Sequence, residues 1–316
     1  MKENIQEIFE NWNETIIWSC LQGIMGEIHT NLSEDAAMAI LGDFAFYAGS
    51  PSEELVKFKP ESCKQDFIIM VPQNAKWADL IEKCYGDKAK KVTRYATKKE
   101  TDIFDVEKLN QAIVSLPLGY ELKVIEEAEY NMCRENGWAN DLVSQYKDYN
   151  IYKNLGLGIA VLKDGELVAG ASSYSTYDKG IEIEIDTKKE HRRKGLAYAC
   201  GARLILECLE KGLYPSWDAQ NKWSVALAQK LGYQFSHEYV AYEVIFIPEG
   251  VEALPREIID APEYRRNGIA LHTLDLLVKD AKEQGVSQIA LEATDMGRPL
   301  YERYGFVKME DEMELT

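Results

Sequence analysis

Three acidic side chains alternate with isoleucines in the segment IEIEID, at Glu182, Glu184 and Asp186. This two-residue period is typical of a β-strand, in which side chains two positions apart point to the same face. Carboxyl groups that share a face and lose part of their hydration have raised pKa values, which suits a general base. Glu184 is the first candidate for that role and Glu182 the second. The alternative is a half-exposed strand whose acidic residues face solvent.

A second chemical candidate follows directly, in the segment HRRKGLA at residues 191–197. A glycine loop that enters a helix exposes unpaired backbone N–H groups, and the helix dipole adds positive partial charge there. Such a site binds phosphate, with Gly195 permitting a close approach and Arg192, Arg193 and Lys194 adding positive charge. The alternative is that Gly195 only permits a tight turn and that the basic side chains are solvated.

The same pattern recurs as YRRNGIA at residues 264–270. One offset without a gap also superposes Gly212 on Gly285 and Gly232 on Gly305. A register that extends over a strand, a loop and two helices indicates an internal repeat. Other phosphate-binding motifs are absent from the sequence, which has neither a GxxxxGK[ST] loop nor a GxGxxG motif after a strand.

Hydrophobic periodicity predicts the elements that position these residues. Before the first glycine loop we expect a helix at 104–115, a strand at 120–125, helical segments to about 148, and strands in GLGIAVLKDG, ELVAGASSYSTY and GIEIEID. Asp164-Gly165 predicts a hairpin between the first two of these strands. After the loop we expect a helix that ends before Gly212, a strand YPSWDA, a helix NKWSVALAQKLG and a strand pair YQFSHEYVAYEVIFI. Together they form a mixed sheet with helices packed on it.

The segment from IEIEID to ALAQKLGY resembles the GNAT N-acetyltransferases, whose [QR]-x-x-G-x-[GA] signature follows the central strand and holds the pyrophosphate of acetyl-CoA. The segment from LPLGYELKVI to EYVAY, which contains the pattern PxWDxxNxxSxxLAxxLGY at residues 215–233, resembles more narrowly the zwittermicin-A-resistance type. The resemblance implies an α/β GNAT fold, with a central mixed and splayed β-sheet flanked by helices. It also implies that the repeat is the second half of another GNAT domain.

The resemblance further implies roles for individual residues, with acetyl-CoA (coenzyme A) as the cofactor. The strand around the acidic residues splays from its neighbour and pairs its backbone, at Ile183 and Ile185, with the pantetheine arm. Asn221 and Ser224 match positions that contact the cofactor arm. The implied pyrophosphate site consists of Arg192, Arg193, Lys194, Gly195, Leu196 and Ala197.

The general acid is less clearly marked. Many GNAT enzymes place a tyrosine in LYEKxGF, where it protonates the departing thiolate. The second copy has Tyr301 in LYERYGF, whereas the first copy has Ala228 at that position. The candidates for the general acid of the first copy are Ser224, another tyrosine and water. The remaining alternative is that the thiolate leaves without being protonated by the enzyme. Tyr301 has the alternative role of a core aromatic residue.

Length and composition limit the remaining possibilities. With 316 residues the chain predicts several domains, which we place at 1–102 (an N-terminal α/β domain without a chemical motif), 103–248 (the GNAT domain) and 249–316 (a partial second GNAT-like unit). The last could dock on the first copy, pair with the N-terminal domain, exchange within a homodimer, or be a vestige.

A net charge of -17 argues against nucleic acid and anionic membranes as partners and favours cationic small molecules.

Cysteine and histidine spacings predict no metal site, because the sequence has no CxxC pair and no HxxxH motif. The acidic N-terminus MKENIQEIFENW is unlike a signal peptide and no segment is apolar enough to span a membrane, so we expect a cytoplasmic protein.

These observations predict an acetyl-CoA-dependent N-acetyltransferase that acts on a primary amine of a small, cationic molecule. Transfer is expected to be direct, in a ternary complex, because no cysteine is set beside a histidine and an acid. One alternative is a non-catalytic acyl-CoA-binding or regulatory protein, and another is an enzyme that acetylates proteins.

Overall fold

The structure is a computed structural model, and it describes residues 2–61, 63, 67–100, 102–245, 278–279, 290–291, 306–309 and 312–315. The chain divides into two compact units, Met1–Phe246 and Ile247–Thr316. The second glycine loop (264–270) and Tyr301 lie outside the described residues. The described strands of the second unit form an antiparallel sheet in the order β13-β15-β14, with bounds Ala290–Leu291 (β13), Phe306–Met309 (β14) and Glu312–Leu315 (β15).

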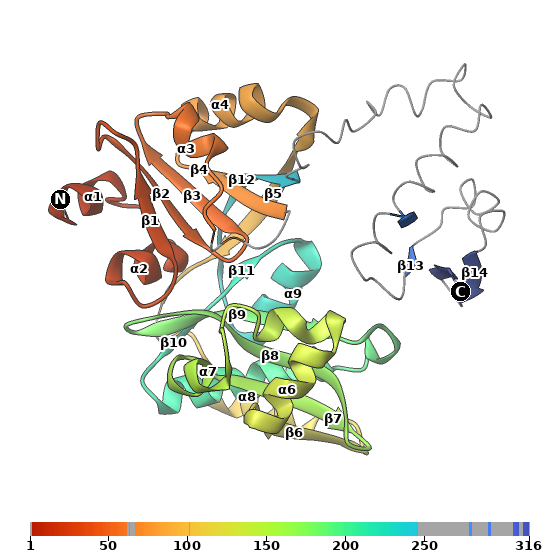
Figure 1. Cartoon of the computed structure of the whole chain (residues 1–316). Coiled ribbons are helices and arrows are strands. Elements are labelled where there is room, and N and C mark those ends of the chain that lie inside the picture. The colour runs from red at the N-terminus through yellow and green to blue at the C-terminus, as the bar shows by residue number, and fades with distance from the viewer. Residues whose placement is uncertain are drawn as a thin grey trace. The chain divides into compact units, whose positions relative to one another are not determined.

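The first unit contains two sheets (Figure 1). The larger sheet has the strand order β1-β2-β3-β4-β12-β5-β11, and its strands are antiparallel except for the β3/β4 pair. Its bounds are Glu27–Thr30 (β1), Ala36–Leu41 (β2), Phe44–Gly49 (β3), Phe67–Pro72 (β4), Ala89–Thr97 (β5), Asp218–Ala219 (β11) and Phe235–Ile245 (β12).

Helices cover both faces of this larger sheet because its central strands are apolar on both sides. Met38 of β2 packs with Trp77 of α4, while its neighbour Ala39 packs with Ile17 of α2. Helices α3 and α4 therefore lie on one face, and α1 and α2 on the other. Their bounds are Lys2–Ile8 (α1), Thr15–Gln22 (α2), Glu53–Lys57 (α3) and Ala75–Tyr85 (α4).

The smaller sheet has the order β10-β9-β8-β7-β6, in which only the β9/β10 pair is parallel among the described strands. Its bounds are Tyr120–Val124 (β6), Gly158–Lys163 (β7), Glu166–Tyr177 (β8), Gly180–Thr187 (β9) and Tyr214–Ser216 (β10). One face packs on α5, α8 and α9 and the other on α6 and α7. These helices span Val106–Val114 (α5), Glu127–Glu135 (α6), Tyr149–Leu155 (α7), Leu196–Glu210 (α8) and Lys222–Leu231 (α9).

The expected α/β class, with mixed sheets flanked by helices, is confirmed. The hairpin at Asp164-Gly165 is also confirmed, with φ values of +52° and +84° that match a tight two-residue turn between β7 and β8. No helix among the described residues is both long and apolar enough to cross a bilayer.

One expected pairing is wrong. The segment YQFSHEYVAYEVIFI does not form a strand pair in the sheet of the middle region. It contains one strand, β12, which lies between β4 and β5 in the larger sheet and pairs with both. The apolar residues Tyr242 and Val244 enter the core beneath α3 and α4, so burial against distant strands outweighs a hairpin with the local sequence.

Candidate active site

Strand β9 places its acidic residues and its isoleucines on opposite faces. Ile181 and Ile183 pack in the core beneath α8, so Glu182 and Glu184 point away from α8. Glu182 is only 8% exposed. Its Oε2 accepts a hydrogen bond from the hydroxyl group of Thr15 (2.5 Å), and its Oε1 accepts one from the backbone N–H of Asp218 (2.7 Å). Burial, together with the charge of Asp218, raises the pKa of Glu182 to about 7.

Glu184 has a different environment. Its side chain is half-buried, and the backbone N–H of Ile185 donates to its Oε1 over 3.2 Å. Among the described residues no donor reaches its Oε2. Burial raises its pKa to about 8, and the negative charges of Asp141 and Asp186 add to that shift. Glu184 thus has a free carboxyl oxygen and a high proton affinity, the properties of a general base.

A small cleft of about 50 Å³ lies in front of both glutamates, between the two sheets. Its walls come from the start of α2 and from six strands, β3, β5, β8, β9, β11 and β12. The lining residues are Glu14, Thr15, Ile16, Phe44, Phe46, Arg94, Tyr174, Glu182, Ile183, Glu184, Asp218 and Tyr239. The cleft therefore requires the first hundred residues as well as the middle of the chain.

The cleft is strongly acidic. Arg94 is the one cation among the described residues that line it, and its Nη2 lies 2.6 Å from Oδ1 of Asp218. The phenol of Tyr239 donates to the other oxygen of Asp218 (2.8 Å). Glu14 is also buried, which raises its pKa to about 7 although Lys99 lies 3.7 Å away. A positively charged ligand would be stabilised in this cleft.

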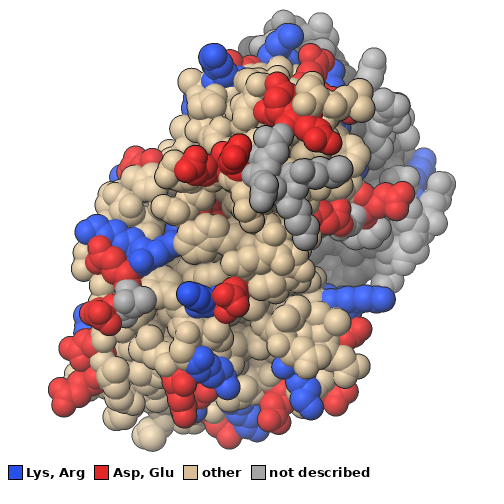
Figure 2. All heavy atoms as spheres, turned by 90° about the vertical axis from the view of Figure 1, so that its left-hand side faces the viewer, with Lys and Arg blue, Asp and Glu red and all other residues tan. Residues whose placement is uncertain are grey.

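Acidic and basic side chains are interspersed on the face of the molecule seen in Figure 2. The negative net charge is therefore not gathered there in one patch. The concentration of carboxyl groups in the cleft is a local feature of the interior, created by the packing of two sheets rather than by the overall composition.

The splay expected beside the central strand is present as a break in pairing. Strand β10 pairs with β9 from Gly180 to Glu182 and then ends, and the next strand, β11, joins β5 in the other sheet. From Ile183 to Thr187, β9 has β8 on one side and no described strand on the other. This open edge offers backbone groups of Ile183 and Ile185 to an extended ligand, in the way that a sheet edge accepts a further strand. The N–H of Ile185 would have to exchange its bond to Glu184 for one to the ligand.

The glycine loop presents free backbone amides at the start of α8. The first hydrogen bond of this helix runs from the N–H of Ala199 to the carbonyl of Gly195 (3.1 Å), so the preceding amides have no helical acceptor. Gly195 has a φ of +81°, and a Cβ atom added to it would meet nothing within 4 Å. The backbone conformation therefore favours glycine, and the space in front of it is open.

The basic side chains of the loop surround this opening. Arg192, Arg193 and Lys194 are exposed, and Nε of Arg192 donates to the carbonyl of Thr187 (3.0 Å), which ties the loop to the end of β9. Leu196 is buried in the core and Ala197 is half-buried. The free amides, the added charge and the open space fit a pyrophosphate group.

Asn221 and Ser224 both have structural partners at the start of α9. The side-chain oxygen of Asn221 accepts from the N–H of Ser224 (2.9 Å) and caps the helix. The hydroxyl oxygen of Ser224 accepts from Nε1 of Trp217 (3.0 Å), which leaves its own proton free to be donated. Ala228 is fully buried on α9, so the position that holds a tyrosine in the resembled pattern is filled by a core methyl group.

Sequence reasoning missed the residues that surround Glu182. Thr15 and Glu14 lie in NETIIW, which has no chemical pattern, and Arg94 lies in a strand segment. Asp218 is the fourth residue of the PxWD pattern and was the one available signal.

Comparison with known proteins places this site in a family context. A family model described as GNAT acetyltransferase matches residues 6–242, and one described as acetyltransferase (GNAT) domain matches residues 257–315. The crystal structure of a GCN5-related N-acetyltransferase-like protein from Streptococcus suis 89/1591 is similar, with 46% identity and a TM-score of 0.73 over 77% of this chain and 98% of that one. The uncharacterized N-acetyltransferase YdfB of Bacillus subtilis (strain 168) is 35% identical over 137 residues, which are 41% of this chain and 50% of that protein. The chain thus matches half the length of this curated relative.

Proposed function

The chain belongs to the GNAT acetyltransferase family, and from that premise we propose that it is an acetyl-CoA-dependent N-acetyltransferase acting on a primary amine of a small, cationic molecule. The observation that carries the proposal is the placement of Glu184 beside the open edge of β9 and within an acidic cleft. The narrower resemblance to the zwittermicin-A-resistance type makes an amino-polyol antibiotic one candidate acceptor.

The residues at the open edge and the glycine loop fit the cofactor. The amides from Arg193 to Ala197 would hold its pyrophosphate, and the backbone of Ile183 and Ile185 would pair with its pantetheine arm. When bound, acetyl-CoA supplies an acetyl group on a thioester whose sulfur departs as the amine nitrogen attacks.

Residues of the chain itself accept and donate the protons of the reaction. In its ionised form Glu184 accepts the proton that the amine must lose, and its pKa of about 8 gives that form a high proton affinity. Glu182, with both oxygens occupied, positions the strand and adds negative charge. Ser224 retains a free hydroxyl proton and is the candidate acid of the first copy, because Ala228 has none to give.

The match of residues 257–315 supports a partial second GNAT-like unit. We propose that it lies in a domain at 249–316, after an N-terminal domain at 1–102 and a GNAT domain at 103–248. Tyr301 is the candidate acid if the second glycine loop carries a cofactor.

A non-catalytic acyl-CoA-binding role is the second candidate, because Ala228 replaces the usual acid. It predicts that the protein binds the cofactor and transfers no acetyl group to any amine.

Calorimetric titration of acetyl-CoA into the purified protein and three variants tests the proposal. Gly195→Glu places a side chain and a negative charge in the proposed pyrophosphate site. Gly212→Glu is the matched control, because Gly212 lies at the other end of α8, with a φ of +68° and no atom near an added Cβ. Both variants incur a backbone cost of about 1–2 kcal/mol. Gly268→Glu tests the second loop.

Stoichiometric binding that is lost in Gly195→Glu and kept in Gly212→Glu supports a cofactor site in the first copy. If binding is lost in Gly268→Glu instead, the cofactor site lies in the second copy. Absence of binding to the unchanged protein contradicts the proposal.

A further inference from the structure

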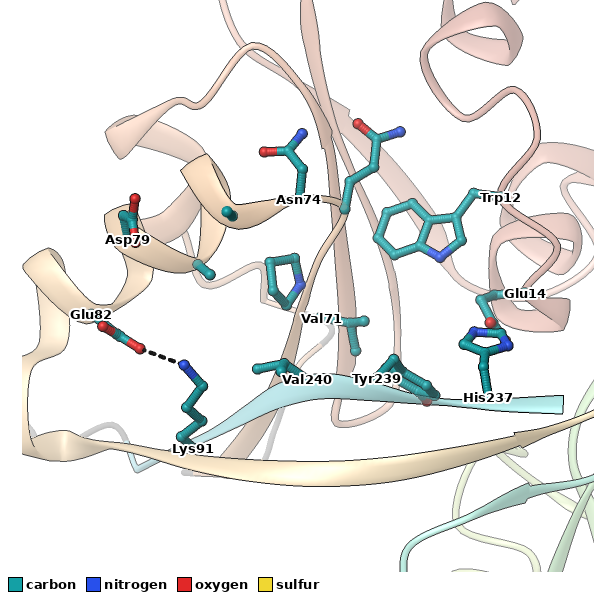
Figure 3. Close-up of a pocket in the computed structure, with 14 residues that line it drawn as sticks. Trp12, Glu14, Val71, Asn74, Asp79, Glu82, Lys91, His237, Tyr239 and Val240 are labelled. Atoms are coloured by element: carbon teal, nitrogen blue, oxygen red, sulfur yellow. Dashed lines mark hydrogen bonds and ion pairs between the residues drawn. The ribbon is translucent and has the colours of Figure 1, made fainter. Parts of the chain in front are cut away.

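A second hollow of about 510 Å³ lies next to the cleft (Figure 3). It is formed by the segment before α2, the start and exposed side of α4, and strands β4, β5 and β12. Trp12, Glu14 and His237 lie at one end in Figure 3, and Glu82 and Lys91 at the other. Its size is that of a pocket for a small organic molecule.

This hollow is continuous in its lining with the cleft, because Glu14 and Tyr239 line both. The phenol of Tyr239 reaches Asp218 in the cleft, while its ring forms part of the wall of the hollow. The cleft and the hollow therefore adjoin at Glu14 and Tyr239.

The charges of the hollow favour a cation. Three carboxyl groups, of Glu14, Asp79 and Glu82, line it together with one lysine, Lys91. Lys91 is already 3.2 Å from Glu82, and it is therefore not free to bind an anion. Asp79 is exposed and has no ion-pair partner among the described residues.

Other polar groups in the wall are used by the fold. The side chain of Gln73 donates to the carbonyl of Ile8 (3.1 Å) and accepts from the N–H of Gly49 (3.1 Å). The side-chain oxygen of Asn74 caps α4. Because Glu14 is paired with Lys99 (3.7 Å), what remains for a ligand is Asp79 and the aromatic rings of Trp12 and Tyr239, and such rings bind cations and alkyl chains.

We propose that the hollow is the second half of the acceptor site, and that the acceptor is an extended molecule with two or more amino groups. This inference rests on the acetyltransferase function proposed above. One amino group meets Glu184 in the cleft, the connecting chain passes Tyr239 and Trp12, and a distal ammonium group binds Asp79. The attacking group reacts as a neutral amine. Its nitrogen bonds to the acetyl carbon as the C–S bond of the thioester breaks, one nitrogen proton passes to the carboxylate of Glu184, and the departing thiolate takes up a proton, while the distal ammonium keeps its protons.

The test compares 1,8-diaminooctane with 1-aminooctane, which differ by one amino group. Acetyl transfer to each is measured with the full chain, with Asp79→Asn, and with Asp87→Asn as a matched control. Asp87 is exposed in the turn after α4 and does not line the hollow. We expect kcat/KM to favour the diamine at least about five-fold, and Asp79→Asn to remove most of that preference. Asp87→Asn should preserve it.

Equal kcat/KM values for the two amines overturn this inference and leave the transferase function intact, as does a preference that survives Asp79→Asn. If neither amine is acetylated, calorimetric titration of the diamine decides on this inference, and the titration of acetyl-CoA described above decides separately on the transferase proposal. Binding that Asp79→Asn weakens supports the diamine site, and absence of binding overturns it.

Discussion

The hydroxyl group of Thr15 donates to Oε2 of Glu182 over 2.5 Å, across 167 positions of sequence. This contact brings the start of α2 against β9 of the other sheet. Because the N–H of Asp218 takes the second oxygen, Glu182 joins three distant segments. Its neighbour on the same face, Glu184, keeps an oxygen free, and this difference separates a positioning role from a catalytic one.

Replacing Glu184 by glutamine should lower kcat by about 10²–10⁴-fold, the range typical for loss of a general base. Acetyl-CoA affinity should stay unchanged, because the carboxyl group lies on the face away from the core and apart from the glycine loop. Steady-state kinetics with calorimetry measure both quantities. Glu190→Gln, on an exposed residue before the loop, is the control. Turnover that survives Glu184→Gln removes this residue as the base.

Thr15→Val should destabilise the fold by about 1–3 kcal/mol, because a buried carboxylate loses a donor. The hydroxyl group lowers the pKa of Glu182, so its removal raises that pKa further. The variant therefore loses more stability than the native protein as pH rises through 7. Urea unfolding at pH 6 and pH 9 measures the difference, with Thr93→Val on the exposed side of β5 as control. An equal loss at both pH values contradicts the assigned contact.

The native protein should itself become less stable between pH 5 and pH 9. Burial first, and nearby negative charges second, raise the pKa of Glu184 to about 8, and burial raises those of Glu182 and Glu14 to about 7. Since these values exceed those of the unfolded chain, the folded state binds more protons in this range, and stability falls as they are released. Urea midpoints across the range test the sign. Glu184→Gln should flatten the curve, whereas a native curve that rises with pH would contradict the burial of these groups.

The parts of the site that sequence could predict are those with local patterns. The alternation in IEIEID follows from one strand with one buried face, and the glycine loop follows from a strand-to-helix connection with a positive φ at Gly195. Thr15 and Arg94 could not be predicted, because they reach the cleft through packing between two sheets. The same cause explains β12, whose residues pair with strands more than a hundred positions earlier.

The ion pair of Arg94 provides the most direct test of the packing between the two sheets. Its Nε and Nη2 each lie 2.6 Å from Oδ1 of Asp218, and its guanidinium lies 4.7 Å from the centre of the Phe44 ring. The two side chains are only 12% and 17% exposed, so removing the cation leaves a poorly hydrated carboxylate close to Glu182.

Arg94→Leu should therefore lower the free energy of unfolding by about 3 kcal/mol, measured in urea at pH 7. The matched double variant Arg94→Leu with Asp218→Asn should recover part of that loss, because it removes the uncompensated charge along with its partner. The free energy of unfolding of Arg94→Lys should lie between those of Arg94→Leu and the double variant, since lysine keeps the charge and loses the two-nitrogen contact. A loss of less than about 1 kcal/mol in the free energy of unfolding of Arg94→Leu is the value expected of a solvent-exposed ion pair. Such a result would mean that water reaches Asp218, and it would contradict the desolvation of the cleft.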